Sequence, residues 1–175
     1  MSTHIFSQSI SSANTSINKN QFPYIYSHIN WEKLRGKEVI DYGCGRYTQH
    51  IEALMAKYDI KWYGYDPYWR NAIQNGEAIH CDPDIVLCSN VLNVIKENLI
   101  VSRIHDTIKY AYMPTMGYFI KVYEGSKSSV GKQTKKDCWQ RNQPTESYMY
   151  SDEIIKCGII TQKGCEDLIV SKSII

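Results

Sequence analysis

The chain has 175 residues, of which 43% are hydrophobic and 22% charged, and its formal net charge is +2. These values are ordinary for one soluble globular domain with a buried core, and the charge alone is too small to indicate nucleic-acid or membrane binding. No apolar stretch reaches the ~18 residues of a membrane span, and the polar N-terminus lacks the pattern of a secretion signal. We therefore expect one cytoplasmic domain over 1–175 without a membrane partner.

Residues 1–20 are rich in Ser, Asn and Thr without apolar periodicity, which predicts a flexible tail or a lid that folds over a ligand. The apolar spacing over 22–34 favours a helix. An apolar run over 39–42 predicts the first strand, and the i, i+3, i+4, i+7 spacing over 50–58 predicts a helix. The run 61–65 is short and apolar on both faces, as in a buried parallel strand.

The middle of the chain predicts further strands and a long helix. Residues 67–83 contain two prolines and few apolar residues, so we expect a loop there. Strands are predicted over 85–88 and 117–123, with a helix over roughly 90–112 between them, in which Asn98 is the candidate point of interruption. The polar segment 124–147 is long for a loop in a compact domain, which indicates a functional or mobile role.

The C-terminal part predicts the last elements of the sheet. Ser151, followed by two acids, predicts an N-cap and a short helix ending at Gly158. Two β-prone runs, 159–161 and 168–175, predict an antiparallel pair that closes the sheet. The expected fold class is α/β, with a mostly parallel central sheet flanked by helices and an antiparallel C-terminal strand pair.

Two glycines, Gly43 and Gly45, follow the first predicted strand, and Asp66 ends the second. A lone GxG turn occurs wherever a strand meets a helix tightly, but it also lets backbone N–H groups approach a ligand closely. An acid at the tip of the next strand accepts hydrogen bonds from the hydroxyls of a ribose. Together, these residues predict a site for an adenosine-containing cofactor.

These residues resemble the first two motifs of the class I S-adenosylmethionine (SAM)-dependent methyltransferases, on Asp41-Tyr-Gly-Cys-Gly45 and Tyr65-Asp66-Pro67. The run Asp84-Ile-Val-Leu-Cys-Ser-Asn-Val-Leu-Asn-Val-Ile95 resembles the fourth strand and following helix of that class, although a plain buried strand with a helix cap explains it equally when taken alone. NAD enzymes instead carry GxGxxG, and here Thr48 occupies the sixth position, which favours SAM. The resemblance implies cofactor contacts by Asp41, Tyr42, Gly43, Cys44, Gly45, Tyr65, Asp66, Pro67, Ser89 and Asn90.

The resemblance covers nearly the whole chain and extends to small methyltransferase-like proteins from phages and bacteria. It implies a Rossmann-like methyltransferase fold and SAM as the cofactor, and leaves the substrate open. In two places the chain departs from the wider class. Tyr47 replaces the third glycine of GxGxG, and the segment between Asp66 and Asp84 is too short for a regular third strand. We therefore expect Cys81 or Asp82 to contact the adenine.

Five basic residues and one acid, Asp137, lie in the segment 127–142, together with Trp139. Basic side chains beside an aromatic ring hold phosphates and stack bases, although a solvated lysine-rich loop explains each lysine singly. The expected substrate contacts are Asn14, Asn18, Trp139, Gln140, Arg141 and Asn142. If a general base is needed, the candidates are Tyr123, Glu124 and Asp137.

Several features that would narrow the function are missing. The six cysteines form no CxxC pair and no Cys/His cluster with zinc-finger spacing, so we expect reduced thiols and no metal site. There is no (D/N/S)PP(Y/F) motif and no Pro-Cys nucleophile, which disfavours a conventional DNA-base methyltransferase. The hypotheses are a SAM-dependent methyltransferase for a small molecule or nucleotide-type acceptor, a nucleic-acid methyltransferase using the basic loop, and a non-catalytic SAM-binding or sequestering protein.

Overall fold

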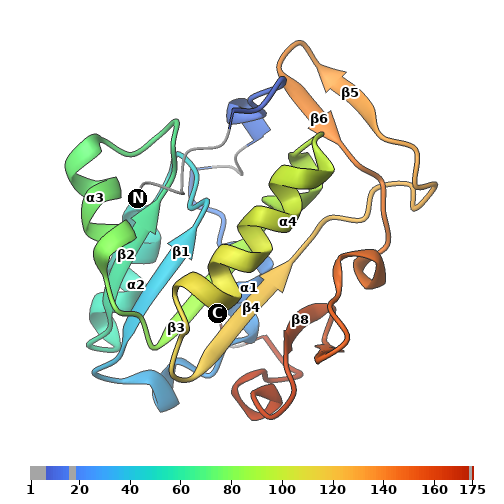
Figure 1. The fold of residues 1–175 in the computed structure, drawn as a ribbon. Coiled ribbons are helices and arrows are strands. Elements are labelled where there is room, and N and C mark those ends of the chain that lie inside the picture. Colours follow the sequence, from blue (N-terminus) through green and yellow to red (C-terminus); the bar gives the residue numbers. More distant parts are fainter. Residues whose placement is uncertain (1–6, 16–18, 174) are drawn as a thin grey trace.

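The computed structural model describes residues 7–15, 19–173 and 175. A six-stranded sheet has the order β2-β1-β3-β4-β8-β7, and a separate hairpin pairs β5 with β6 (Figure 1). The strands are β1 Glu38–Tyr42, β2 Lys61–Tyr65, β3 Ile85–Ser89, β4 Gly117–Lys121, β5 Lys132–Lys135, β6 Cys138–Gln140, β7 Glu153–Lys156 and β8 Ile159–Gln162.

Within the described residues, four α-helices and several short 3-10 and π-helical segments complete the fold. The α-helices are α1 Tyr24–His28, α2 Gln49–Lys57, α3 Ala72–His80 and α4 Asn98–Asp106, and α4 continues into a π-helical turn, Thr107–Ala111. The 3-10 helices are Ala13–Thr15, Trp31–Leu34, Leu92–Val94, Thr145–Tyr148 and Glu166–Leu168. No helix in the described ranges is long and apolar enough to cross a membrane.

The four strands β2, β1, β3 and β4 are parallel, and β8 and β7 continue the sheet in antiparallel pairing. Asp41 of β1 pairs with Gly64 of β2 on one side and with Leu87 of β3 on the other. The chain order reverses between β1 and β3, and at such a point the connections leave toward opposite faces of the sheet. In open α/β sheets this opens a crevice at the carboxyl ends of the strands.

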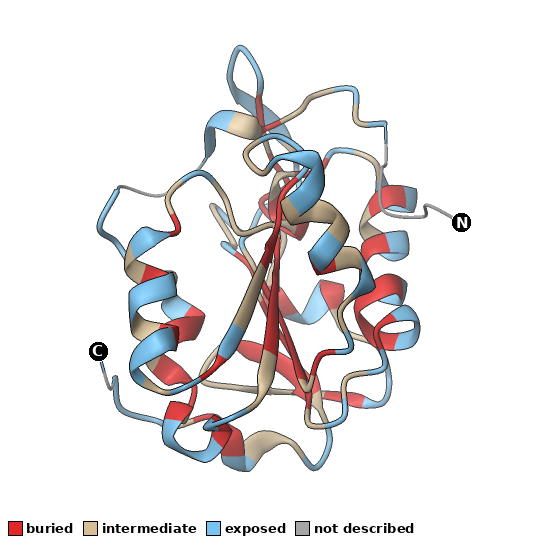
Figure 2. Cartoon of the chain, turned by 90° about the vertical axis from the view of Figure 1, so that its left-hand side faces the viewer, coloured by how far each residue is buried: buried red, intermediate tan, exposed pale blue. Residues whose placement is uncertain are grey.

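Each face of the sheet has its own apolar core, because successive side chains of a strand point to opposite faces. Helices α3 and α4 cover one face, and α1 and α2 cover the other (Figure 1); the strands between them are largely buried (Figure 2). The first core contains Ile40, Val86, Tyr118, Ile100 and Ile104. The second contains Val39, Leu87, Phe119, Ile25 and Ile51.

The sequence patterns correctly predicted the parallel strands of the sheet. The structure confirms an α/β fold with helices on both faces, the four parallel strands and the helix expected over 50–58. The helix expected over 22–34 is instead two short helices separated by Ile29 and Asn30. The helix expected over 90–112 is likewise broken, and its α-helical part begins only at Asn98.

The prediction of a loop over 67–83 is wrong, because α3 occupies much of this segment. Asn71 caps this helix: its side chain accepts from the Gln74 backbone N–H, and the Gln74 side chain accepts from the Asn71 backbone N–H. This reciprocal capping box is readable in the sequence as Asn-x-x-Gln, and it offsets the weak apolar pattern of the segment.

The prediction of a helix over 151–158 is also wrong, since Glu153–Lys156 is strand β7. Ile154 and Ile155 favour a strand, and Cys157 and Gly158 both have positive φ, as a two-residue hairpin turn requires. Strand β8 therefore pairs with β7 instead of with 168–175. In the latter segment Leu168 ends the 3-10 helix Glu166–Leu168, and Ile169 forms one isolated bridge with Ile29.

Glu153 is a buried carboxylate that ties β7 to the rest of the domain. It accepts hydrogen bonds from the Tyr118 hydroxyl (2.6 Å) and the Tyr150 backbone N–H, and its Oε2 lies 2.7 Å from His105 Nε2. His105 is itself buried and stacks on the Tyr150 ring. Every oxygen of this acid therefore has a partner, as a buried charge requires.

Replacing Glu153 with alanine is expected to lower the free energy of unfolding by about 3–5 kcal/mol, because His105 and the Tyr118 hydroxyl lose their partner inside the domain. Urea denaturation followed by circular dichroism measures this. The exposed acid Glu146 provides the control, and Glu146→Ala is expected to change stability by less than about 0.5 kcal/mol. Equal effects of the two substitutions would contradict this account of Glu153.

Candidate functional site

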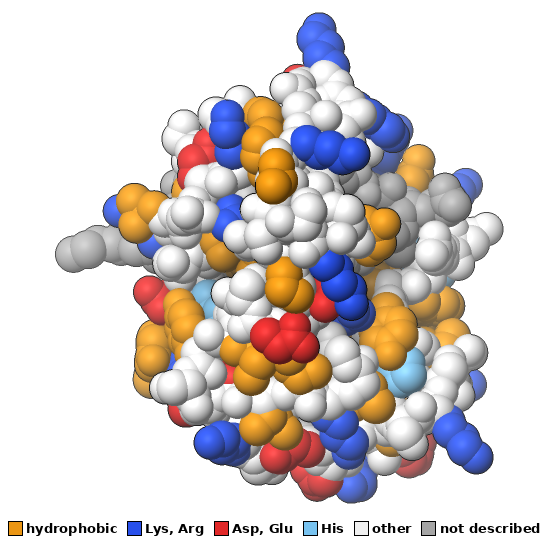
Figure 3. Space-filling view, turned by 90° about the vertical axis from the view of Figure 1, so that its right-hand side faces the viewer, with side chains coloured by type: hydrophobic (Ala, Val, Ile, Leu, Met, Phe, Trp, Pro, Cys, Tyr) orange, Lys and Arg blue, Asp and Glu red, His pale blue; other side chains and the backbone are white. Residues whose placement is uncertain are grey.

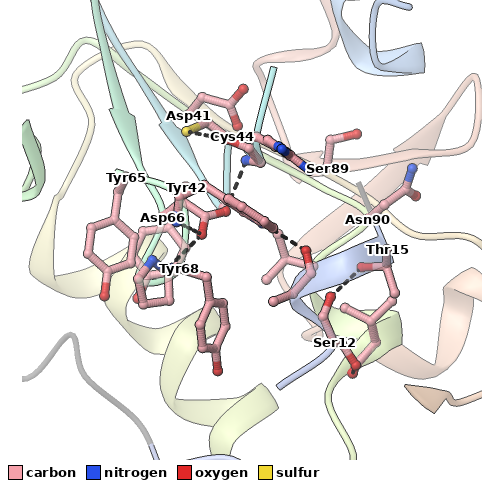
Figure 4. Close-up of a pocket in the computed structure, with 18 of the residues that line it drawn as sticks. Ser12, Thr15, Asp41, Tyr42, Cys44, Tyr65, Asp66, Tyr68, Ser89 and Asn90 are labelled. Carbon is pink, nitrogen blue, oxygen red and sulfur yellow. Dashed lines mark hydrogen bonds between the residues drawn. The ribbon is translucent and has the colours of Figure 1, made fainter. Parts of the chain in front are cut away.

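A pocket opens where the parallel strands β1, β2 and β3 end (Figure 4). It holds about 1040 Å³ of free space, the open mouth included. Four chain segments supply most of the lining, namely 41–47 at the end of β1, 65–69 at the end of β2, parts of 89–95 at the end of β3, and parts of 8–15 near the N-terminus; Pro23 and Ile104 complete it. The pocket therefore lies in the crevice that the strand order predicts.

The turn between β1 and α2 is fixed by backbone hydrogen bonds to β2. The N–H groups of Gly43 and Cys44 donate to the Tyr65 carbonyl at 2.7 and 3.0 Å. Gly43 has φ +83°, and a Cβ at this position would lie 2.2 Å from a methyl carbon of Val91. The glycine is thus required by the turn and by the close contact with the segment after β3.

Asp66 is the acid that joins the tip of β2 to the glycine turn. One carboxylate oxygen accepts from the Gly45 N–H at 2.9 Å, and the other accepts from the N–H groups of Tyr68 (2.9 Å) and Trp69 (3.2 Å). Burial raises the pKa of Asp66, and these three hydrogen bonds oppose the shift. A carboxylate has about four acceptor positions, so Asp66 has room for one further donor from a ligand.

Asp41 lies in the pocket at the end of a buried hydrogen-bond chain. The Tyr26 hydroxyl of α1 donates to Asp41 Oδ2 at 2.7 Å, and Trp62 Nε1 donates to the Tyr26 oxygen at 2.9 Å. Burial raises the pKa of Asp41 to about 7, with a further increase from the charge of Asp66 and opposing contributions from Tyr26 and Arg70. The side chain therefore changes charge near neutral pH.

The tip of β3 contributes two polar side chains to the pocket. Ser89 Oγ is buried and has no hydrogen-bond partner within the described part of the chain. Asn90 has φ +57°, and its backbone N–H donates to the Lys121 carbonyl at 2.7 Å, which leaves its exposed side chain at the pocket. Both residues line the same pocket as Asp66. Ser89 in particular offers an unused donor and acceptor to a ligand.

Residues 8–15, here called the N-terminal strap, run along the pocket wall opposite the glycine turn. Trp69 Nε1 donates to the Ala13 carbonyl at 2.7 Å, and the Ser12 hydroxyl donates to the Val94 carbonyl at 2.7 Å. Ser12 and Thr15 face the cavity from this side (Figure 4). The described residues of the N-terminal segment therefore form part of the pocket wall. Asn14 is exposed and does not line the pocket, and Asn18 falls outside the described residues.

Most of the expected cofactor contacts come together, since Asp41 to Gly45, Tyr65 to Pro67, Ser89 and Asn90 all line the pocket. The expected adenine contacts do not. Cys81 and Asp82 lie beyond α3, and the Cys81 thiol donates to the Ala78 carbonyl at 3.2 Å. The helix α3, which was expected to be a loop, carries this segment away from the pocket.

The candidate general bases also lie outside the pocket. Tyr123 is 62% exposed and Asp137 is exposed. Glu124 pairs with Lys127 at 2.8 Å and accepts from Thr145, and these contacts hold the pKa of Glu124 at about 2. A carboxylate with so low a pKa is a weak base. In the structure, none of the three has a catalytic position in this pocket.

The expected substrate contacts in 139–142 are mainly structural. Arg141 donates to the carbonyls of Ile95 (2.9 Å) and Lys96 (3.1 Å) and also to Asn98. The side chains of Gln140 and Asn142 are buried and bond to backbone carbonyls at Tyr123 and Val130. Trp139 is half-buried and donates its backbone N–H to the strap, at Ser12. None of these four residues lines the pocket.

The pocket also contains residues that were not expected as contacts from the sequence, among them Ser12, Arg46, Tyr68 and Trp69. The Arg46 guanidinium lies over the Trp69 ring at 4.8 Å from its centre, beside the Tyr47 ring at 5.4 Å. The sequence offers one signal for this group, an aromatic run that follows Asp66 directly. The contact of that run with the strap depends on the folded chain and has no local signature.

No family model matches this chain, and no curated protein or solved structure matches it significantly. Within the described ranges no group of three or more His, Cys, Asp or Glu side chains is placed to hold a metal ion. The six cysteines are free thiols.

The raised pKa of Asp41 predicts how stability depends on pH. The folded state keeps this proton up to about pH 7, whereas an unfolded chain loses it near 3.8. Wild-type stability should therefore fall as pH rises from about 4 to about 7, by up to roughly 4 kcal/mol. Asp41→Asn cannot titrate, so over this range it should become progressively more stable relative to the wild type. Urea denaturation of both proteins across this range tests the prediction, and a constant difference between them would contradict it.

Proposed function

We propose that this chain binds SAM in the pocket and transfers its methyl group to a small-molecule or nucleotide-type acceptor. One observation carries the proposal: the glycine turn, Asp41 and Asp66 meet in a single pocket at the carboxyl ends of three parallel strands. Strand order supports a Rossmann-like methyltransferase fold, since four parallel strands are followed by an antiparallel pair at one edge.

The charge and hydrogen bonding of the pocket favour SAM over a dinucleotide. Asp41 and Asp66 both face the cavity, and two carboxylates favour a cationic sulfonium over a pyrophosphate. A pyrophosphate also needs free N–H groups at the glycine turn. Here the N–H groups of Gly43 and Cys44 already bond to Tyr65, and that of Gly45 bonds to Asp66.

The residues present suit the parts of SAM. Asp66 has one acceptor position left, which fits one ribose hydroxyl rather than both. Ionised Asp41 suits the positive methionine end, and Ser89 Oγ supplies an unused hydrogen-bonding group beside it. SAM supplies an activated methyl group, so the protein mainly has to align the acceptor and exclude water. The strap shields the pocket for that purpose.

We also consider two alternative functions. A non-catalytic SAM-binding or sequestering protein is favoured by the positions of Tyr123, Glu124 and Asp137, which leave the pocket without a candidate base. A nucleic-acid methyltransferase is favoured by the basic segment 127–142. Transfer to an acceptor that needs no base, such as a ring nitrogen, is consistent with all these positions.

Methyl transfer is tested by incubating the protein with tritium-labelled SAM and a cell extract, then measuring label in fractions. We expect transfer to an acceptor, and Asp66→Ala should reduce it at least about tenfold, because it removes a charged hydrogen bond to the cofactor. Glu77→Ala provides the control, since Glu77 is an exposed acid on α3 outside the pocket.

Circular dichroism of Asp66→Ala is needed beside the assay, because Asp66 also holds three backbone N–H groups. Label in a nuclease-sensitive fraction would identify a nucleic-acid acceptor. SAM binding without any labelled product would contradict transfer and support the non-catalytic alternative.

A further inference from the structure

The β5–β6 hairpin stands away from the main sheet and exposes its outer strand. It projects at one end of the molecule, beside the N-terminal strap (Figure 1). All four residues of β5 are exposed, so both faces of this strand meet solvent. Packing against a core therefore does not determine the sequence Lys-Gln-Thr-Lys of this strand. We ask instead what this exposed surface could bind.

The exposed strand carries concentrated positive charge. Lys132, Lys135 and Lys136 are exposed, and within the described chain none of them has an ion pair. Lysine and arginine side chains gather at this end of the molecule (Figure 3). Asp137 is the one acid of the hairpin, and its backbone carbonyl accepts a hydrogen bond from the strap. Three lysines against one acid give the hairpin a net positive charge.

The inner strand holds this charged surface rigidly. Arg141, just after β6, donates to two carbonyls of the segment that precedes α4, and Cys138 and Gln140 are buried. The Trp139 ring packs so closely on Gly131 that a Cβ there would lie 2.5 Å from it. The ammonium of Lys96 lies 5.1 Å from the centre of the same ring. A half-buried aromatic ring beside a cation is a surface on which a base stacks.

Ser12 connects the hairpin to the pocket. Its N–H donates to the Asp137 carbonyl at 2.8 Å, its hydroxyl accepts from the Trp139 N–H at 3.0 Å, and the same hydroxyl donates to Val94 in the pocket wall. A polymer held on the hairpin therefore passes close to the pocket mouth. Arg46, exposed at that mouth, adds a further cation.

We propose that the β5–β6 hairpin binds the phosphate backbone of a single-stranded nucleic acid and presents one of its bases toward the pocket. The contact to the backbone stands independently of SAM. The delivery of a base to the pocket rests on the proposed function and selects nucleic acid as its acceptor class. A single strand fits because its bases are free to stack on Trp139 and to enter a pocket, whereas duplex bases are not.

The test is fluorescence anisotropy with labelled oligouridine RNA and oligothymidine DNA of about fifteen nucleotides, without SAM, over a series of salt concentrations. The triple variant Lys132→Glu, Lys135→Glu, Lys136→Glu should bind at least about tenfold more weakly at about 100 mM salt. The slope of log affinity against log salt should become shallower by about 2, because each phosphate that no longer binds a lysine reduces it by about 0.7.

A triple variant with the same change of charge elsewhere, Lys57→Glu, Lys163→Glu, Lys172→Glu, provides the control, since these three lysines are exposed outside the hairpin. It should retain most of the wild-type affinity and slope. The proposal is overturned if wild-type protein does not bind single strands at low salt, if the hairpin variant binds like the control, or if a duplex binds as tightly. Binding to single strands in a protein that takes up no SAM would refute the proposed function alone.

Discussion

The pocket depends on one buried carboxylate. Asp66 bonds to the glycine turn after β1 and to two N–H groups of the segment after β2, so a single side chain sets the distance between the two strand tips. The Tyr65 carbonyl strengthens the same junction through two further hydrogen bonds. These contacts hold the turn against the aromatic segment that carries Trp69, and the Trp69 ring in turn donates to the Ala13 carbonyl of the strap.

The same junction limits what the pocket accepts. Because the turn's N–H groups are used internally, the site lacks the anion-binding character of a phosphate loop and offers carboxylates instead. Asp41 adds a charge that depends on pH, and its partner Tyr26 comes from α1, well outside the cofactor motifs. Charge in the pocket is therefore set partly by the packing of an N-terminal helix against the sheet.

Local signals predicted the four parallel strands, and most of the cofactor contacts expected from the sequence lie in the pocket. Gly43, Gly45 and Asp66 stand at strand ends, and strand ends of a parallel sheet meet at one edge, so sequence order alone brings them together. The failures have different causes. The capping box at Asn71–Gln74 and the turn at Cys157-Gly158 can be recognised in the sequence, but the composition of their segments favoured other structures. The roles of Arg141 and Ser12 have no local signal, because their partners lie more than forty residues away.

The central claim is that the pocket recognises SAM, and calorimetric titration tests it most directly. Wild-type protein should release or absorb heat with SAM and with its demethylated product, and none with NAD. SAM affinity should rise between about pH 6 and about pH 8 as Asp41 ionises, whereas Asp41→Asn should lack this rise. A folded wild-type protein that gives no heat with SAM or its product at any pH in this range would contradict the account.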